Sequence, residues 1–147
     1  MLPHAKKEAK VEKKGIREDV EELCESNTCS NVLFFESKKR KDLYLWLARR
    51  DGPSVKFMVE SIQTSQELKM TGNNLKFSRP LLSFDKAFEA EAEGNLHLRL
   101  MKEMFTQTFS TPQFHPKSKP FIDHIFSFKY FKGRVWFRSY QILNEED

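Results

Sequence analysis

The spacing of apolar residues changes several times along the chain, and each change predicts a different element. Four residues recur at the intervals of one helix face and predict a helix that begins at residue 16: Ile16, Val20, Leu23 and Cys24. The short apolar run in "NVLFFES" has the length of a buried strand rather than a helix. The segment "DLYLWLARR" is predicted to be a short helix with Asp42 as its N-cap.

In the middle of the chain, Gly52 and Pro53 mark a turn, and the alternation in "SVKFMVESI" predicts a strand after it. Thr64 and Glu67 have the spacing of a capping box, which predicts a short helix that ends near Gly72. The segment "RPLLSFD" predicts a third strand, because a proline at its start needs no hydrogen-bond donor for the ladder.

The strongest helical pattern covers residues 95–109 and ends before Pro112. Its apolar stripe consists of Leu96, Leu100, Met101, Met104 and Phe105. After it, "FIDHIFSF" and "RVWFRSYQI" flank a turn at Lys132–Gly133 and predict a hairpin. Helices alternate with strands before this hairpin, so the predicted fold class is α/β, of the mixed α+β kind.

Composition agrees with one folded domain of moderately basic charge. The chain has 147 residues, of which 39% are hydrophobic and 14 are Phe, enough for a real core. Its formal net charge of +4 permits a nucleic-acid partner without requiring one. No apolar run has the length of a membrane span, and the lysine-rich residues 1–15 lack the apolar centre of a signal peptide. We therefore expect a cytosolic or nuclear protein in which residues 1–15 form a basic surface or mobile segment.

The residues that could carry catalytic or metal chemistry lack the spacing that such sites need. Cys24 and Cys29 have no further zinc ligands at finger-like spacing, so we expect reduced thiols. Asp123 and His124 are adjacent in a predicted strand, which places their side chains on opposite faces and prevents an acid–base pair. His124 is predicted to be a packed histidine, and a cationic segment separates it from His115. The sequence thus predicts no enzyme activity, metal site, cofactor or small-molecule substrate.

Basic and aromatic residues are a stronger candidate for function. By alternation, the last predicted strand carries Arg134, Trp136, Arg138 and Tyr140 on one face. Such a face can contact phosphates and stack on unpaired bases; alternatively, the two aromatic residues belong to the core and the arginines are solvated. The other candidate RNA-binding residues lie in loops, where cations are commonly only solvated: Lys38, Lys39, Arg40, Lys41, Lys69, Lys76, Arg79, Lys117 and Lys119.

Several long segments occur in the order typical of one family: "LPHAKKE", "NVLFFESKKRKDLYLWL", "GPSVKF", "ELKMTGNNLKFSRPLLSFD", "HPKSKPFIDHIFSF" and "GRVWFRSYQI". On these segments, nearly the whole chain resembles the Brix family of ribosome-assembly factors. The resemblance implies an α/β domain of two similar halves, each like the anticodon-binding domain of certain tRNA synthetases. It also implies a nucleolar protein, not an enzyme, that binds large-subunit ribosomal RNA, other assembly factors and ribosomal proteins.

The chain departs from the family pattern at its ends and at two positions. It lacks the strand that usually precedes "LPH" and the segment that usually follows the last strand, so residues 16–147 are expected to be a partial Brix domain, truncated at both ends. Phe77 replaces a family glycine and Ser139 a common asparagine. If residue 77 has a positive φ, Phe77→Gly should stabilise the chain. Two further hypotheses stay open: a protein–protein module of pre-ribosomal particles without direct RNA binding, and a non-functional truncated copy.

Overall fold

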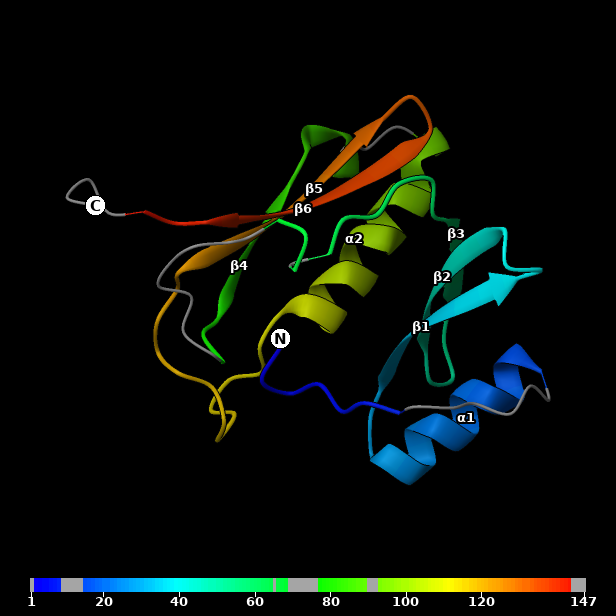
Figure 1. Cartoon of the computed structure of the whole chain (residues 1–147), viewed down its shortest axis with the longest axis horizontal. Helices are drawn as coiled ribbons and strands as arrows, with labels where there is room; N and C mark the ends of the chain where they lie inside the picture. The colour runs from blue at the N-terminus through cyan, green and yellow to red at the C-terminus, as the bar shows by residue number, and fades with distance from the viewer. Residues whose placement is uncertain (1, 9–14, 65, 69–76, 90–92, 144–147) are drawn as a thin grey trace. The chain divides into compact units, whose positions relative to one another are not determined.

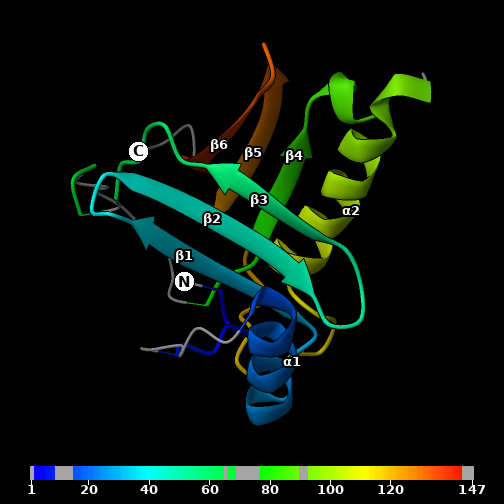
Figure 2. The same cartoon turned by 90° about the vertical axis from the view of Figure 1, so that its right-hand side faces the viewer.

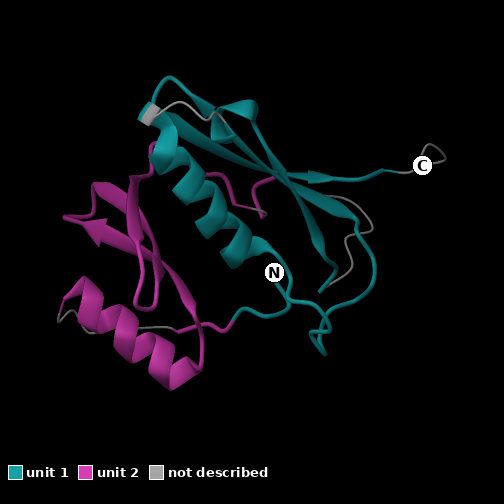
Figure 3. Ribbon diagram, turned by 180° about the vertical axis from the view of Figure 1, so that it is seen from behind, with its two compact units in different colours: residues 1–5, 71–147 teal, residues 6–70 magenta. Residues whose placement is uncertain are grey.

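The computed structural model describes residues 2–8, 15–64, 66–68, 77–89 and 93–143 (Figure 1). Its contacts divide the chain into two compact units (Figure 3): unit 1 contains residues 1–5 and 71–147, and unit 2 contains residues 6–70. Each unit has one α-helix and one three-stranded sheet among the described residues. The mixed α+β class predicted from the sequence is therefore confirmed.

The sheet of unit 2 is antiparallel, with strand order β1–β2–β3 (Figure 2). Its strands are β1 (Asn31–Lys38), β2 (Asp42–Arg49) and β3 (Ser54–Met58). The predicted helix in "DLYLWLARR" is wrong, because this segment is the central strand β2, in which Leu45 pairs with both Phe35 and Phe57. Apolar residues occupy both faces of β2, so its period-two pattern resembles a continuous apolar run. Hydrogen-bonding partners on both sides decide the conformation.

Helix α1 (Ile16–Asn27) packs against strands β1 and β2 of this sheet. The buried cluster between them consists of Val20, Cys24, Val32 and Ala48, with Leu23, Cys29 and Phe34 at its border. Acidic residues in the first turn, Glu18 and Asp19, have the favourable sign for the helix dipole. Thr28 ends the helix in the left-handed region, with φ of 52°, and the Cys29 N–H donates to the Cys24 carbonyl at 3.0 Å. This helix and the strands predicted in 31–37 and 54–59 are confirmed.

The predicted capping box forms its local hydrogen bonds without a helix in the described residues. The Glu67 carboxylate accepts from the Thr64 N–H at 2.6 Å and from the Thr64 hydroxyl at 3.1 Å. Residues 66–68 form a turn. The rest of the predicted helix, 69–72, lies outside the described residues.

The sheet of unit 1 has the order β4–β5–β6, in which β4 is parallel and β6 antiparallel to the central strand. Its strands are β4 (Pro80–Phe84), β5 (His124–Phe131) and β6 (Arg134–Gln141). The connection from β4 to β5 contains the 3-10 turns η1 (Lys86–Phe88) and η2 (Glu93–Asn95) and helix α2 (Leu96–Phe109). Lys132 and Gly133, with φ of 49° and 74°, form the turn of the predicted hairpin. The strand at Pro80, the helix and the hairpin are confirmed. The predicted apolar stripe of the helix is partly wrong, because Leu96 and Leu100 are 70% and 47% exposed, whereas Leu98, which was left out of the stripe, is 1% exposed.

An aromatic core joins α2 to one face of the unit 1 sheet. Phe128 on the central strand is 1% exposed, and its ring centroid lies 4.6 Å from that of Phe105 and 4.9 Å from that of Phe84. Phe109 stacks on Phe137, with 5.5 Å between ring centroids. Because these rings occupy one face of the sheet, the alternate residues of β5 and β6 point to the opposite face.

Candidate nucleic-acid interface

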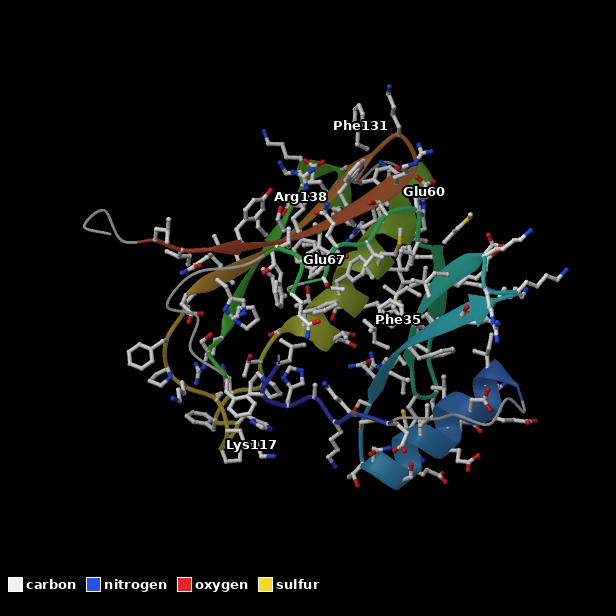
Figure 4. The ribbon with its side chains drawn as sticks, viewed as in Figure 1. Phe35, Glu60, Glu67, Lys117, Phe131 and Arg138 are labelled. Carbon is white, nitrogen blue, oxygen red and sulfur yellow. The ribbon has the colours of Figure 1, made fainter. Side chains whose placement is uncertain are left out.

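The face of the unit 1 sheet opposite α2 carries all four residues predicted on the last strand. Figure 4 labels one of them, Arg138. Arg134, Trp136, Arg138 and Tyr140 alternate with Phe137, whose ring lies in the aromatic core. Trp136 is 45% exposed and Tyr140 is 44% exposed. Both rings lie on the sheet face opposite the aromatic core and are half exposed, so the alternative in which they are core residues is wrong. The face decides this, because Phe137 belongs to the core although it is 50% exposed.

The strand register adds residues to this face that sequence reasoning missed. Tyr140 pairs with Ile125, Trp136 with Lys129, and Arg134 with Phe131, and directly paired residues share a face. Leu81 of β4 lies on the same face, because it pairs with Ile125 of β5. We call this surface the open face: Leu81, Ile125, Lys129, Phe131, Arg134, Trp136, Arg138 and Tyr140. The two-residue turn at 132–133 fixes this register, so the β5 members were predictable from the same hairpin.

Charge and aromatic surface are adjacent on the open face. The Arg138 guanidinium carbon lies 5.7 Å from the Trp136 ring centroid, a cation–π contact. Phe131 and Leu81, 62% and 49% exposed, extend the apolar area. A base or another planar group could stack on these rings while the arginines contact phosphates or carboxylates.

A second group of predicted residues lies around the loop 115–119 of unit 1. The Arg79 side chain donates from Nη2 to the Ser118 hydroxyl at 3.4 Å. Backbone bonds hold the two segments together: the Arg79 N–H donates to the Phe121 carbonyl, and the Lys119 N–H donates to the Phe77 carbonyl, both at 2.9 Å. Lys117 and Lys119 are exposed. Two further predicted cations, Lys69 and Lys76, lie outside the described residues.

The third group, Lys38, Lys39, Arg40 and Lys41, forms the tip of the β1–β2 hairpin in unit 2. All four side chains are exposed. The predicted residues that the structure describes thus fall into three local groups, two in unit 1 and one in unit 2.

Asp123 and His124 form a contact that the sequence analysis excluded. His124 Nδ1 lies 2.6 Å from Asp123 Oδ1, and the Ser78 hydroxyl donates to the same carboxylate oxygen at 2.5 Å. The prediction was wrong because β5 begins at His124, so strand alternation does not apply to Asp123. Ser78 is only 3% exposed, and its hydroxyl lies 3.2 Å from the same histidine nitrogen, Nδ1, that faces Asp123. This arrangement joins the starts of β4 and β5 and offers no exposed nucleophile. The His124 ring packs against Phe126 as predicted, at 5.1 Å between centroids.

The remaining chemistry of the described residues is limited. Cys24 and Cys29 are free thiols, as predicted. Burial is the largest of the causes that raise the pKa of Cys24 from 9.0 to about 11, and the contact with Cys29 adds to it. In the part of the chain that the structure describes, no three His, Cys, Asp or Glu side chains gather as metal ligands. None of the described helices has the length and apolar character needed to cross a membrane.

Comparison with known families matches the chain to the Brix domain over residues 1–147. The chain therefore belongs to the Brix-domain family, as the resemblance of its motifs indicated.

Relatives from distant animals have closely similar sequences. The chain is 48% identical over 147 residues to the ribosome biogenesis protein BRX1 homolog of Xenopus laevis, covering 99% of this chain and 42% of that protein. It is 48% identical to the homolog of Homo sapiens, covering 99% of the chain and 40% of that protein. For the homolog of Drosophila melanogaster, the identity is 47%, with 99% and 40% covered. The chain thus spans about two fifths of the length of these relatives.

Proposed function

We propose that the chain is a ribosome biogenesis factor that binds ribosomal RNA and assembly partners while the large ribosomal subunit matures. The Brix-domain match and the names of the relatives support a role in ribosome biogenesis. The same resemblance supports a non-enzymatic protein of the nucleus and nucleolus, with other assembly factors and ribosomal proteins as neighbours.

The open face is the observation that carries the RNA-binding part of this proposal. Two half-exposed aromatic rings, Trp136 and Tyr140, lie four residues apart on β6, with Arg138 between them. Aromatic rings on a sheet bind unpaired bases by stacking, and neighbouring cations neutralise phosphates. The proposed ligand of this face is therefore a single-stranded segment of ribosomal RNA.

One observation favours a second candidate, in which the open face binds another protein. Phe131 and Leu81 add exposed apolar area that a protein partner could cover. The two candidates differ in salt dependence. Phosphate-dominated binding weakens steeply as salt rises, whereas an apolar interface changes little.

Trp136→Ala is the substitution that tests RNA binding by the open face. Loss of one stacked base weakens binding by about 1–3 kcal/mol, so we expect an affinity roughly tenfold lower for an unstructured RNA. Fluorescence anisotropy of a labelled RNA measures this affinity. Because the Trp136 side chain is half exposed, the melting temperature should change little.

The matched control is Phe114→Ala, which removes an aromatic side chain that is 92% exposed and lies outside the sheet. This variant should bind RNA like the parent chain. Equal affinities for Trp136→Ala and the parent would contradict base stacking on this face. Strong binding to RNA without salt dependence would contradict phosphate contacts.

A further inference from the structure

The tip of the β1–β2 hairpin combines charge with an unfavourable backbone conformation. The Lys41 N–H donates to the Lys38 carbonyl at 3.0 Å, which closes a four-residue turn. Its two central residues, Lys39 and Arg40, have φ of 49° and 56°. Hairpins that need two consecutive residues at positive φ prefer Asn-Gly there, because other side chains crowd the backbone. Lysine and arginine therefore make this turn less stable than it would otherwise be.

Charge adds a second cost at the same position. Lys38, Lys39, Arg40 and Lys41 are consecutive and exposed, so they repel one another. Among the described residues, no carboxylate lies within ion-pair distance of any of the four, whereas the nearby Lys56 is paired with Glu36 at 3.2 Å. Lys38 extends toward the Tyr44 ring, 5.8 Å from its centroid.

The tip lies far from the hydrophobic core of unit 2, so core packing does not explain why these residues occur there. Helix α1 packs on the sheet at Val32 and Ala48, which pair with each other. Val32 precedes Lys38 by six residues on β1. At the rise of an extended strand, this separation is about 20 Å. Phe114 and Lys132 are also exposed at positive φ, so strain alone does not mark a site. At the tip, four consecutive cations occupy the strained turn, and this combination points to function.

We propose that residues 38–41 form a binding site for the phosphodiester backbone of RNA, retained at the expense of hairpin stability (the tip is cyan in Figure 1). This inference rests on the proposed function and deepens it. The four side chains carry cations and no aromatic ring, so we assign to the site the negatively charged phosphates and not a stacked base. The tip therefore binds RNA irrespective of sequence, and the open face of unit 1 contributes the contacts with unpaired bases.

Two double variants separate the charge from the strain. K39N/R40G removes two cations and installs the turn residues that positive φ favours; K39Q/R40Q removes the same charges and keeps side chains that positive φ disfavours. We expect K39N/R40G to raise the melting temperature above that of the parent and above that of K39Q/R40Q. Both variants should bind RNA more weakly than the parent.

The readouts are thermal unfolding by circular dichroism and anisotropy titrations with an unstructured RNA and an RNA duplex, each at several salt concentrations. Each lost phosphate contact lowers the slope of log affinity against log salt by about 0.7–0.9, so the loss of both cations should lower it by about 1.4–1.8. The matched control is K132N, which places Asn-Gly in the turn of the β5–β6 hairpin, where Lys132 has φ of 49°. Its melting temperature should rise while its affinity falls less than that of either double variant.

Different results contradict different parts of the account. RNA binding by the parent with unchanged affinity and slope in both double variants would overturn the phosphate site and leave the proposed function standing. Loss of binding to an acidic polypeptide such as polyglutamate, with RNA binding unchanged, would reassign the tip to a protein partner. A melting temperature of K39N/R40G that is no higher than that of K39Q/R40Q would overturn the strain argument. Absence of RNA binding by the parent chain would overturn both the site and the RNA-binding function on which it rests.

Discussion

Phe77 holds its backbone at φ of 72°, a region that only glycine adopts without crowding its own side chain. Phe77→Gly is expected to stabilise the chain if residue 77 has a positive φ, and the structure meets that condition. Phe114 has a similar backbone, with φ of 58°, but its ring is 92% exposed. A comparison of the two residues therefore separates the cost of the backbone conformation from the contribution of side-chain packing.

We predict that Phe77→Gly stabilises the chain by roughly 0.5 kcal/mol. Relief of a left-handed conformation contributes about 1 kcal/mol, and part of this gain is offset because the half-buried ring loses its contacts. Thermal unfolding of the variant and the parent measures the difference.

Two controls accompany this test. Phe114→Gly should stabilise by about 1 kcal/mol, because almost no packing is lost. Phe77→Ala should destabilise, because it removes the ring and keeps the strain. A melting temperature of Phe77→Gly at or below that of the parent would refute the prediction.

Cys24 predicts a pH dependence of stability in the alkaline range. Its pKa is about 11 in the folded chain and near the ordinary value of 9.0 when unfolded, so the folded state holds the proton more tightly. Stability is therefore unaffected by this thiol below pH 9.0 and falls between pH 9.0 and about 11. The loss amounts to about 2–3 kcal/mol in total.

Denaturant unfolding at several pH values, compared with Cys24→Ala, measures this dependence. Other groups also titrate at alkaline pH, so the relevant quantity is the difference between the two chains. The parent should lose its advantage over Cys24→Ala as pH rises from 9.0 to about 11. Parallel stability curves for the two chains would count against a buried, protonated thiol.

At the scale of elements, periodicity located helix α2 within one residue of its bounds, but it did not identify Leu98 as a buried residue. The final hairpin was recognised from its turn at Lys132–Gly133. Its first strand lies three residues later than predicted, because apolar residues occur on both of its faces. Strand β2 has leucines on one face and Tyr44 and Trp46 on the other, so the apolar pattern alone did not separate strand from helix. Strand β2 forms because its backbone pairs with β1 on one side and β3 on the other, and the pattern within β2 does not reveal these partners.

The candidate site was predictable to a similar extent. Alternation along β6 correctly placed Trp136 and Tyr140 on one face, but their exposure depended on the side of the sheet that α2 covers. Asp123 was misplaced by a single residue, since β5 begins directly after it. Contacts such as that between Ser78 and Asp123 join residues 45 positions apart, and no local pattern reveals them.

At the scale of the whole molecule, the candidate residues are distributed over both units. The open face and the loop 115–119 belong to unit 1, and the cationic tip belongs to unit 2. The tip and the loop offer mainly cations, whereas the open face offers cations beside exposed rings. We therefore predict that several separate contacts contribute to RNA binding.

Co-sedimentation of the tagged chain with ribosomal precursors on a sucrose gradient, at low and raised salt, tests the central claim most directly. We predict that the chain migrates with precursors of the large subunit at low salt and is released as salt rises. Migration at the top of the gradient at both salt concentrations would contradict the account, as would co-migration that raised salt leaves unchanged.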